Sequence, residues 1–284
     1  MKKSTVFGTL LTVGLSLTLA ACGSNGSSSD SSSAGSSKDD TTTIKIGASN
    51  VPHAEILEFA EPLLEKEGIK LDITTYNDYV IPNVALDEGD IDANYFQHIP
   101  FFESAVAEND YDFVNAGAIH IEPLGLYSKK YKNLDEVKKG ATVLVSNSQA
   151  DWGRVISILA DNDLVTLKDG VDPTTATFDD IDKNPKELNF EYENDPALMT
   201  TLYQQDEGDL VAINSNFAVD QDINPLEDSI ALESTSSPYA NIIAIRSEDA
   251  KDPAILKLVE VLKSKEVQDF ILDKWNGAVV PVKD

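Results

Sequence analysis

Residues 78–102 read DYVIPNVALDEGDIDANYFQHIPFF, and their helix–strand–helix pattern is the clearest indication of the fold. It predicts a short helix over Tyr79 to Leu86, a strand over Ile91 to Tyr95, and a second helix over residues 101–106. The strand ends in amide, imidazole and aromatic side chains, which together can line a pocket for a half-apolar ligand. The alternative for the aromatic pair that opens the second helix is an ordinary place in the core.

The same alternation of strand and helix continues on both sides of this stretch. Before it we expect a strand over residues 43–48, a helix through residues 56–64 and a strand over Ile69 to Tyr76. After it, Asp112 to Ile121 is extended. Repeated alternation of this kind predicts an α/β fold, with a mainly parallel sheet covered by helices.

A second unit begins near Leu124. It carries extended runs at residues 124–128, 141–146, 188–192 and 210–213, and a helix over residues 155–164. A last strand over residues 239–245 and two helices within 253–275 follow it. The first unit has few strands of its own, so we expect the chain to return to it. The predicted lobes are residues 44–123 plus 238–284 for lobe 1, and residues 124–237 for lobe 2.

The chain is strongly acidic. It has 49 acidic and 22 basic side chains, and its formal net charge is −27. Its hydrophobic fraction of 42% is ordinary, so the acidity is laid over a normal core and is not the signature of a disordered tail. Such a surface repels nucleic acid and anionic lipid headgroups, and we expect neither as a partner.

The N-terminus resembles that of a bacterial lipoprotein. A positive start, Met1 to Lys3, precedes an uncharged run from Val6 to Ala21, which ends in LAACG. Cys22 is the only cysteine, which excludes an internal disulfide and a cysteine-based zinc site. We therefore predict a signal peptide over residues 1–21, lipidation at Cys22 and a flexible serine-rich tether over residues 22–43. The alternative is an ordinary signal peptide cut beside an unimportant cysteine.

This N-terminus predicts a protein held by lipid on the extracytoplasmic face of the cell membrane. Such a protein is a receptor, a surface enzyme or an adhesin. The sequence contains no GxSxG, HExxH, GxxxxGK[ST] or GxGxxG motif, so we expect neither an enzyme nor a cofactor. A surface hydrolase that uses an Asp/Glu pair stays open, although most carboxylates in so acidic a chain are solvated surface.

Three histidines raise the alternative of a metal-ion receptor. His53, His98 and His120, with Glu55 and Glu122 close by in sequence, could close a tetrahedral zinc site. No pair has the i, i+4 spacing of a helical site. The simpler interpretation is three isolated polar or core residues.

Arg154 is one of only two arginines, and it follows a strand and a polar loop in VLVSNSQADWGR, residues 143–154. The start of a helix presents free N–H groups and favours an anion, and arginine adds a planar fork that matches a carboxylate. The alternative is a surface arginine paired with one of many nearby acids.

Residues 78–102 resemble the NlpA/MetQ family of lipoprotein substrate-binding proteins, the methionine receptors of ABC importers. The resemblance continues through EPLGLYSKKYKNLDEVKKGATV (122–143), the Gly153-Arg154 pair, LVAINSNF (210–217) and SPYAN (237–241). It covers residues 44–284 and the lipoprotein N-terminus. It implies a two-lobe clamp like that of periplasmic binding proteins, with the ligand in the cleft between lobes and an ABC importer permease as partner.

By matching positions, the resemblance also implies a ligand site for methionine or a close relative. An aromatic and imidazole wall would hold the thioether chain, Arg154 would hold the carboxylate, and two amides would bond the amino-acid backbone groups. The wall residues are Tyr79, Phe96 and His98, and the amides are Asn214 and Asn241, with Asn216 as a lower-ranked candidate.

The loop before Arg154 departs from the family. Many relatives carry a Pro-Thr-Asn-Glu-Gly-Arg type of loop, whereas this chain has SQADWGR over residues 148–154. Gly153 and Arg154 are retained, so the expected carboxylate contact survives the comparison. The changed loop leaves the selectivity open between methionine, a related amino acid and a short methionine peptide.

Overall fold

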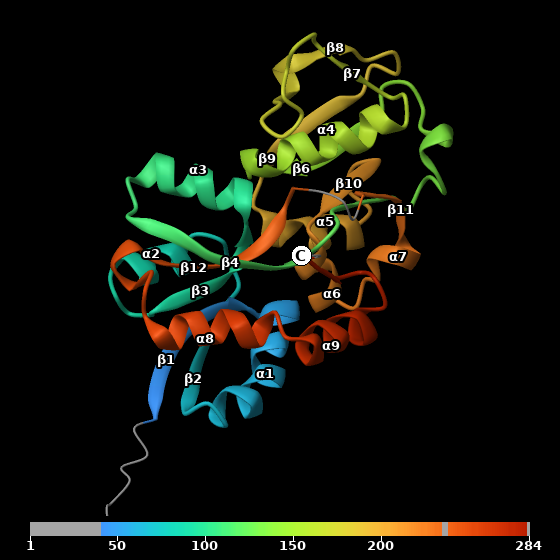
Figure 1. Cartoon of the computed structure of the whole chain (residues 1–284). Coiled ribbons are helices and arrows are strands. Elements are labelled where there is room, and N and C mark those ends of the chain that lie inside the picture. Colours follow the sequence, from blue (N-terminus) through green and yellow to red (C-terminus); the bar gives the residue numbers. More distant parts are fainter. Residues whose placement is uncertain (1–40, 235–237, 283–284) are drawn as a thin grey trace, which may run out of the picture. The chain divides into compact units, whose positions relative to one another are not determined.

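The computed structural model describes residues 41–234 and 238–282 (Figure 1). The predicted signal peptide, Cys22 and nearly all of the predicted tether lie outside these described residues. The described residues belong to one compact unit. None of the helices in the described ranges combines the length and the apolar character needed to cross a membrane.

The first sheet has six strands, in the order β13-β4-β12-β3-β1-β2. β1 pairs in parallel with β2 and β3, whereas β12 runs antiparallel to both β3 and β4, and β13 runs antiparallel to β4. The bounds are β1 (Thr42–Ser49), β2 (Ile69–Tyr76), β3 (Ala93–His98), β4 (Phe113–Ile121), β12 (Ala240–Arg246) and β13 (Val280–Pro281).

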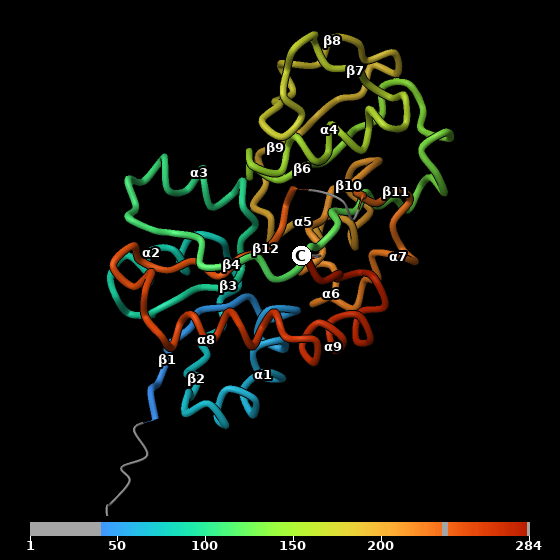
Figure 2. Tube along the Cα trace, in the orientation of Figure 1, coloured from blue at the N-terminus to red at the C-terminus, as the bar shows by residue number. Residues whose placement is uncertain are grey.

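Helices from both ends of the chain pack on this sheet. Figure 2 shows the C-terminal helices beside the N-terminal α1, although they are far apart in sequence. In α8, Ile255, Leu258 and Leu262 recur at helical spacing and are buried, and the Asp252 side chain accepts the first backbone N–H groups. The helices are α1 (Glu55–Glu65), α2 (Ile81–Asp87), α3 (Ile99–Asn109), α8 (Pro253–Leu262) and α9 (Lys265–Trp275).

The second sheet has five strands, in the order β11-β5-β10-β6-β9. A separate two-stranded hairpin follows α4. The strands are β5 (Gly125–Tyr127), β6 (Thr142–Ser146), β9 (Asn189–Asn194), β10 (Leu210–Ile213) and β11 (Ser229–Leu232), and the hairpin is β7 (Thr166–Leu167) with β8 (Ile181–Lys183). The helices are α4 (Trp152–Asp161), α5 (Met199–Gln204), α6 (Ser215–Asp220) and α7 (Pro225–Asp228).

The predicted α/β class, with sheets flanked by helices, is confirmed, but the expectation of mainly parallel sheets is wrong. Only β1, β2 and β3 in the first sheet, and β6, β9 and β10 in the second, form parallel pairs. The other strands, β4, β12 and β13 in the first sheet and β5 and β11 in the second, run antiparallel to their neighbours. β5 follows β4 directly, without a covering crossover helix. The exact lobe boundaries stay predictions, although β12 and β13 hydrogen-bond into the first sheet.

Polar residues gather where several strands end. β3 ends at His98, β6 at Ser146 and β10 just before Asn214, all at the carboxyl ends of parallel strands. β12 runs the opposite way, so its second residue, Asn241, pairs with both His98 and His120 at the same edge. Ligand sites of α/β proteins form at such edges, because the loops that follow the strands leave polar groups unpaired there.

Gly153 is required by close packing at the start of α4. A Cβ at this position would lie 2.2 Å from the backbone carbonyl oxygen of Pro173. We expect Gly153→Ala to lower the free energy of unfolding by about 1–3 kcal/mol, because the segment at Pro173 must move away. Urea denaturation measures this change. Ser157→Ala, one turn further along α4, is the control and should change it by less than about 0.5 kcal/mol. Equal stability of the two variants would contradict the steric argument.

Candidate functional site

Side chains from both sheets line one small cavity. All six residues expected to bind ligand lie in its wall, together with five others. The expected residues are Tyr79, Phe96, His98, Arg154, Asn214 and Asn241, and the additional ones are Gln97, Phe101, Glu122, Ser215 and Asn216. The structure therefore brings the predicted set together, and their roles toward a ligand stay a prediction.

One side of the cavity is an aromatic wall. The ring of Tyr79 lies 5.9 Å from that of Phe96, 5.8 Å from that of Phe101 and 5.1 Å from that of Phe217. The Tyr79 hydroxyl donates a 2.6 Å hydrogen bond to Asn216 Oδ1. The wall is thus apolar on its faces, and its one hydroxyl is satisfied, so it suits an apolar ligand chain.

A closed set of amide hydrogen bonds holds β3, every residue of which is buried. Gln97 Nε2 donates to Asn83 Oδ1 at 2.8 Å and to Asn94 Oδ1 at 2.9 Å, and Asn94 Nδ2 donates to Asn83 Oδ1 at 2.9 Å. Buried amides are costly unless they are paired in this way. The network fixes the strand that carries Phe96 and His98.

Both ring nitrogens of His98 are engaged. Nδ1 accepts the backbone N–H of Phe101 at 3.1 Å, which caps α3, so Nε2 carries the proton and donates to Asp151 Oδ1 at 3.0 Å. His98 therefore presents mainly its ring to the cavity. This geometry agrees with a place in the wall and leaves no free nitrogen for a metal ion.

Asp151 connects three of the expected site residues, and sequence reasoning missed it. Its Oδ1 accepts from Arg154 Nη1 at 3.0 Å as well as from His98, and its Oδ2 accepts from Asn214 Nδ2 at 3.1 Å. Burial raises the pKa of the Asp151 carboxyl, but the bond from His98 and the charge of Arg154 outweigh burial and hold this pKa well below its usual range.

The guanidinium of Arg154 is already occupied by the protein. Nε and Nη2 donate to Glu233 Oε2 at 3.0 and 2.5 Å, and Nη2 also donates to the Glu122 carbonyl at 2.7 Å. With the Asp151 bond, four of the five N–H groups are used. Burial lowers the pKa of Arg154, but Glu233 and Asp151 outweigh it and raise this pKa. One Nη1 N–H is left for a ligand.

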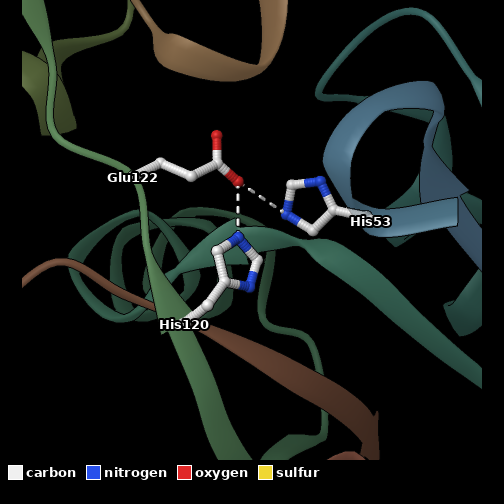
Figure 3. Close-up of side chains that lie close together, drawn as sticks. All are labelled: His53, His120 and Glu122. Carbon is white, nitrogen blue, oxygen red and sulfur yellow. Dashed lines mark hydrogen bonds and ion pairs between the residues drawn. The ribbon is translucent and has the colours of Figure 1, made fainter. Parts of the chain in front are cut away.

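A second buried cluster lies beside the cavity (Figure 3). Glu122 Oε1 lies 2.7 Å from His120 Nε2 and 3.2 Å from His53 Nε2, and its other oxygen is turned away from both rings. The Tyr95 hydroxyl bonds to His120 Nδ1. Burial lowers the pKa of His53 to about 4 and that of His120 to about 3, so both are neutral at pH 7.

The structure does not bring together the three histidines on which the metal-receptor alternative depends. His53, His120 and Glu122 offer ligand atoms within 4.8 Å of one another, but His98 is bound to Asp151 instead. Glu55 forms an ion pair of 2.6 Å with Lys274. Sequence spacing could not separate His98 from the other two, because partners in different elements decide where each ring points. The metal-receptor alternative is not supported.

Two mixed sheets flanked by helices, with one cavity lined from both, define a substrate-binding protein of the periplasmic type. The NlpA lipoprotein family matches residues 44–283, and this chain belongs to that family.

Relatives cover nearly the whole chain. The methionine-binding lipoprotein MetQ of Bacillus subtilis (strain 168) is 45% identical over 284 residues, which are 99% of this chain and 100% of that protein. A crystal structure from Enterococcus faecalis V583, a pheromone cOB1 precursor/lipoprotein of the YaeC family, is 68% identical, with a TM-score of 0.83 over 85% of this chain and 100% of that one. A nutrient-binding protein from Burkholderia cenocepacia, bound to methionine, is 39% identical, with a TM-score of 0.79 over 84% of this chain and 100% of that one.

Removing the charge of Asp151 should destabilise the protein. In Asp151→Asn, we expect the free energy of unfolding to fall by about 1–3 kcal/mol, because three buried donors lose a charged acceptor. The pKa of Asp151 is lowered, so its contribution is complete above the usual aspartate pKa and is lost only as the pH falls below it. The loss measured by urea denaturation should therefore be the same at pH 5 and pH 7.

Glu187→Gln is the matched control for Asp151→Asn. Glu187 pairs with Lys139 at 2.7 Å on an exposed surface, so this variant should change stability by less than about 0.5 kcal/mol. If Asp151→Asn is no more destabilising than this control, the shared-acceptor role of Asp151 is wrong.

Proposed function

We propose that this chain is a receptor that captures methionine on the extracytoplasmic face of the membrane and delivers it to an ABC importer. The observation that carries the proposal is the cavity, which joins an aromatic wall to a charged and amide-lined end. The methionine-bound relative from Burkholderia cenocepacia and the methionine-binding name of the Bacillus subtilis relative support the same ligand.

The two ends of the cavity match the two ends of methionine. The thioether chain is polarizable and packs well against aromatic rings, here Tyr79 and Phe96. In the proposal, the ligand carboxylate meets the remaining Nη1 N–H of Arg154 and the Asn214 amide. Asn241 bonds the backbone groups of the ligand from the other side.

Contacts between the two sheets support a clamp that closes over the ligand. Tyr79 and His98 belong to the first-sheet side, and they bond to Asn216 and Asp151 from the second-sheet side. Closure excludes water, which strengthens the polar contacts inside, and it presents one conformation to the importer. The ligand is released unchanged, so no catalytic residue is assigned.

Calorimetry with L-methionine tests the proposed ligand. The protein is first unfolded and refolded to remove any bound molecule, which is identified by mass spectrometry. We expect Phe96→Ala to weaken methionine binding by roughly 10–200-fold, because a buried aromatic contact is worth about 1.5–3 kcal/mol.

Phe59→Ala is the matched control for the cavity variant. Phe59 stacks on Phe270 between α1 and α9, with ring centroids 4.0 Å apart, and it does not line the cavity. Its loss should leave methionine affinity within about twofold, since distant sites act independently. Absence of methionine binding to the refolded wild type would overturn the proposed function.

The proposed lipid anchor has its own test. Cys22→Ser should move the protein from the membrane fraction to the soluble fraction, because the predicted lipid attachment atom is lost. Methionine affinity should not change. Ser24→Ala, two residues away, is the control and should stay in the membrane fraction. Recovery of Cys22→Ser in the membrane fraction would contradict lipidation at this cysteine.

A further inference from the structure

The carboxylates around the cavity differ in what balances their charge. Asp151 and Glu233 are both bound to Arg154, with donor–acceptor distances between 2.5 and 3.0 Å. The single positive charge of Arg154 is thus opposed by two negative charges before any ligand arrives. These two carboxylates have little left to offer a positively charged ligand group.

Glu122 has no such partner. Among the residues that the structure describes, it forms no ion pair with a lysine or arginine, and its carboxylate faces two neutral histidines and the backbone N–H of Asn216. Its side chain is only 7% exposed, and it lies in the cavity wall. Burial raises the pKa of the Glu122 carboxyl, and the nearby charge of Arg154 only partly opposes this. A cation from the ligand would lower this pKa further and reduce the cost of burying the carboxylate.

The groups around Glu122 orient its carboxylate. An ionised Glu122 can only accept, so the neutral ring of His120 carries its proton on Nε2 and donates to Glu122 Oε1. Its Nδ1 then accepts from the Tyr95 hydroxyl. Figure 3 shows that the second carboxylate oxygen points away from both rings. The histidine pair therefore orients the carboxylate and leaves acceptor capacity on it.

A second acceptor lies next to Glu122. His53 Nε2 is 3.2 Å from Glu122 Oε1 and 3.1 Å from Asn241 Oδ1, so one N–H brings the two oxygens side by side. Both residues line the cavity. An ammonium group has three donors and no acceptor, and such a pair of oxygens matches it.

We propose that Glu122, together with Asn241, binds the ammonium group of the ligand and makes the site selective for primary amines. The proposal deepens the proposed function, since it gives methionine a defined orientation. The ammonium lies at Glu122, and the thioether chain extends to the aromatic wall. Because Arg154 is already neutralised by the protein, the ammonium contributes more to affinity than the carboxylate does.

Two truncated ligands test, on the wild-type protein, whether the ammonium contributes more to affinity than the carboxylate. 3-(Methylthio)propylamine keeps the chain and the ammonium of methionine, and 4-(methylthio)butanoic acid keeps the chain and the carboxylate. We expect the affinities measured by calorimetry to fall in the order methionine, amine, acid, with the acid at least tenfold weaker than the amine. The reverse order would overturn the proposal.

Glu122→Gln then tests the residue itself, with folding checked by thermal unfolding. It should weaken L-methionine by roughly 10–100-fold, the range of a charge-assisted bond, and change the acid by less than about threefold. Glu233→Gln is the matched control. It removes the charge of Glu233, which is bound to Arg154, the proposed partner of the ligand carboxylate. Since methionine and the acid both carry that carboxylate, this variant should change both affinities by a similar factor. A similar loss for both ligands in Glu122→Gln would assign Glu122 a structural role only and overturn the proposal.

Failure of the proposed function can be told apart from failure of this inference. If L-methionine gives no binding heat, the proposed function fails. The amine and the acid are then compared by thermal shift, and stabilisation by the amine alone, lost in Glu122→Gln, still supports the ammonium site. No shift with the amine overturns the inference as well.

Discussion

A single buried guanidinium is the constraint on which the rest of the site depends. A charge inside a protein must be paired and hydrogen-bonded, and Arg154 meets this demand with Asp151, Glu233 and the Glu122 carbonyl. Asp151 in turn fixes His98 and Asn214. The positions of three other cavity residues, Glu122, His98 and Asn214, thus follow from the need to satisfy one arginine.

Much of the fold could be predicted from local patterns. The strand Ile69–Tyr76 and the pair of helices within residues 253–275 were predicted closely, because alternation and helical spacing of apolar residues are local signals. The short strands β7, β8, β11 and β13 were missed, because pairing with distant segments creates them. Strand direction was also mispredicted, since an apolar run looks the same whichever way its neighbour runs.

The site shows the same division. The family resemblance named six residues, and all six line one cavity in the structure. The resemblance did not indicate which groups hold Arg154. Asp151 carried a signal, because it is in the departing loop three residues before Arg154. Glu233 carried none, since it is 79 residues away and meets Arg154 only through the fold. Glu122 was noticed beside His120 as a possible metal ligand, and its place in the cavity wall became visible only with the strand register.

The position of β12 has a consequence for how the chain reaches its native state. β12 lies between β3 and β4, so residues 240–246 complete the middle of a sheet whose other main strands precede residue 122. During synthesis the chain therefore cannot complete this sheet until residues 240–246 have been made. Until then, β3 and β4 each have an edge without its final hydrogen-bonding partner. Under the proposed location outside the cytoplasmic membrane, this order of assembly leaves the first sheet incomplete until residues 240–246 are available to it.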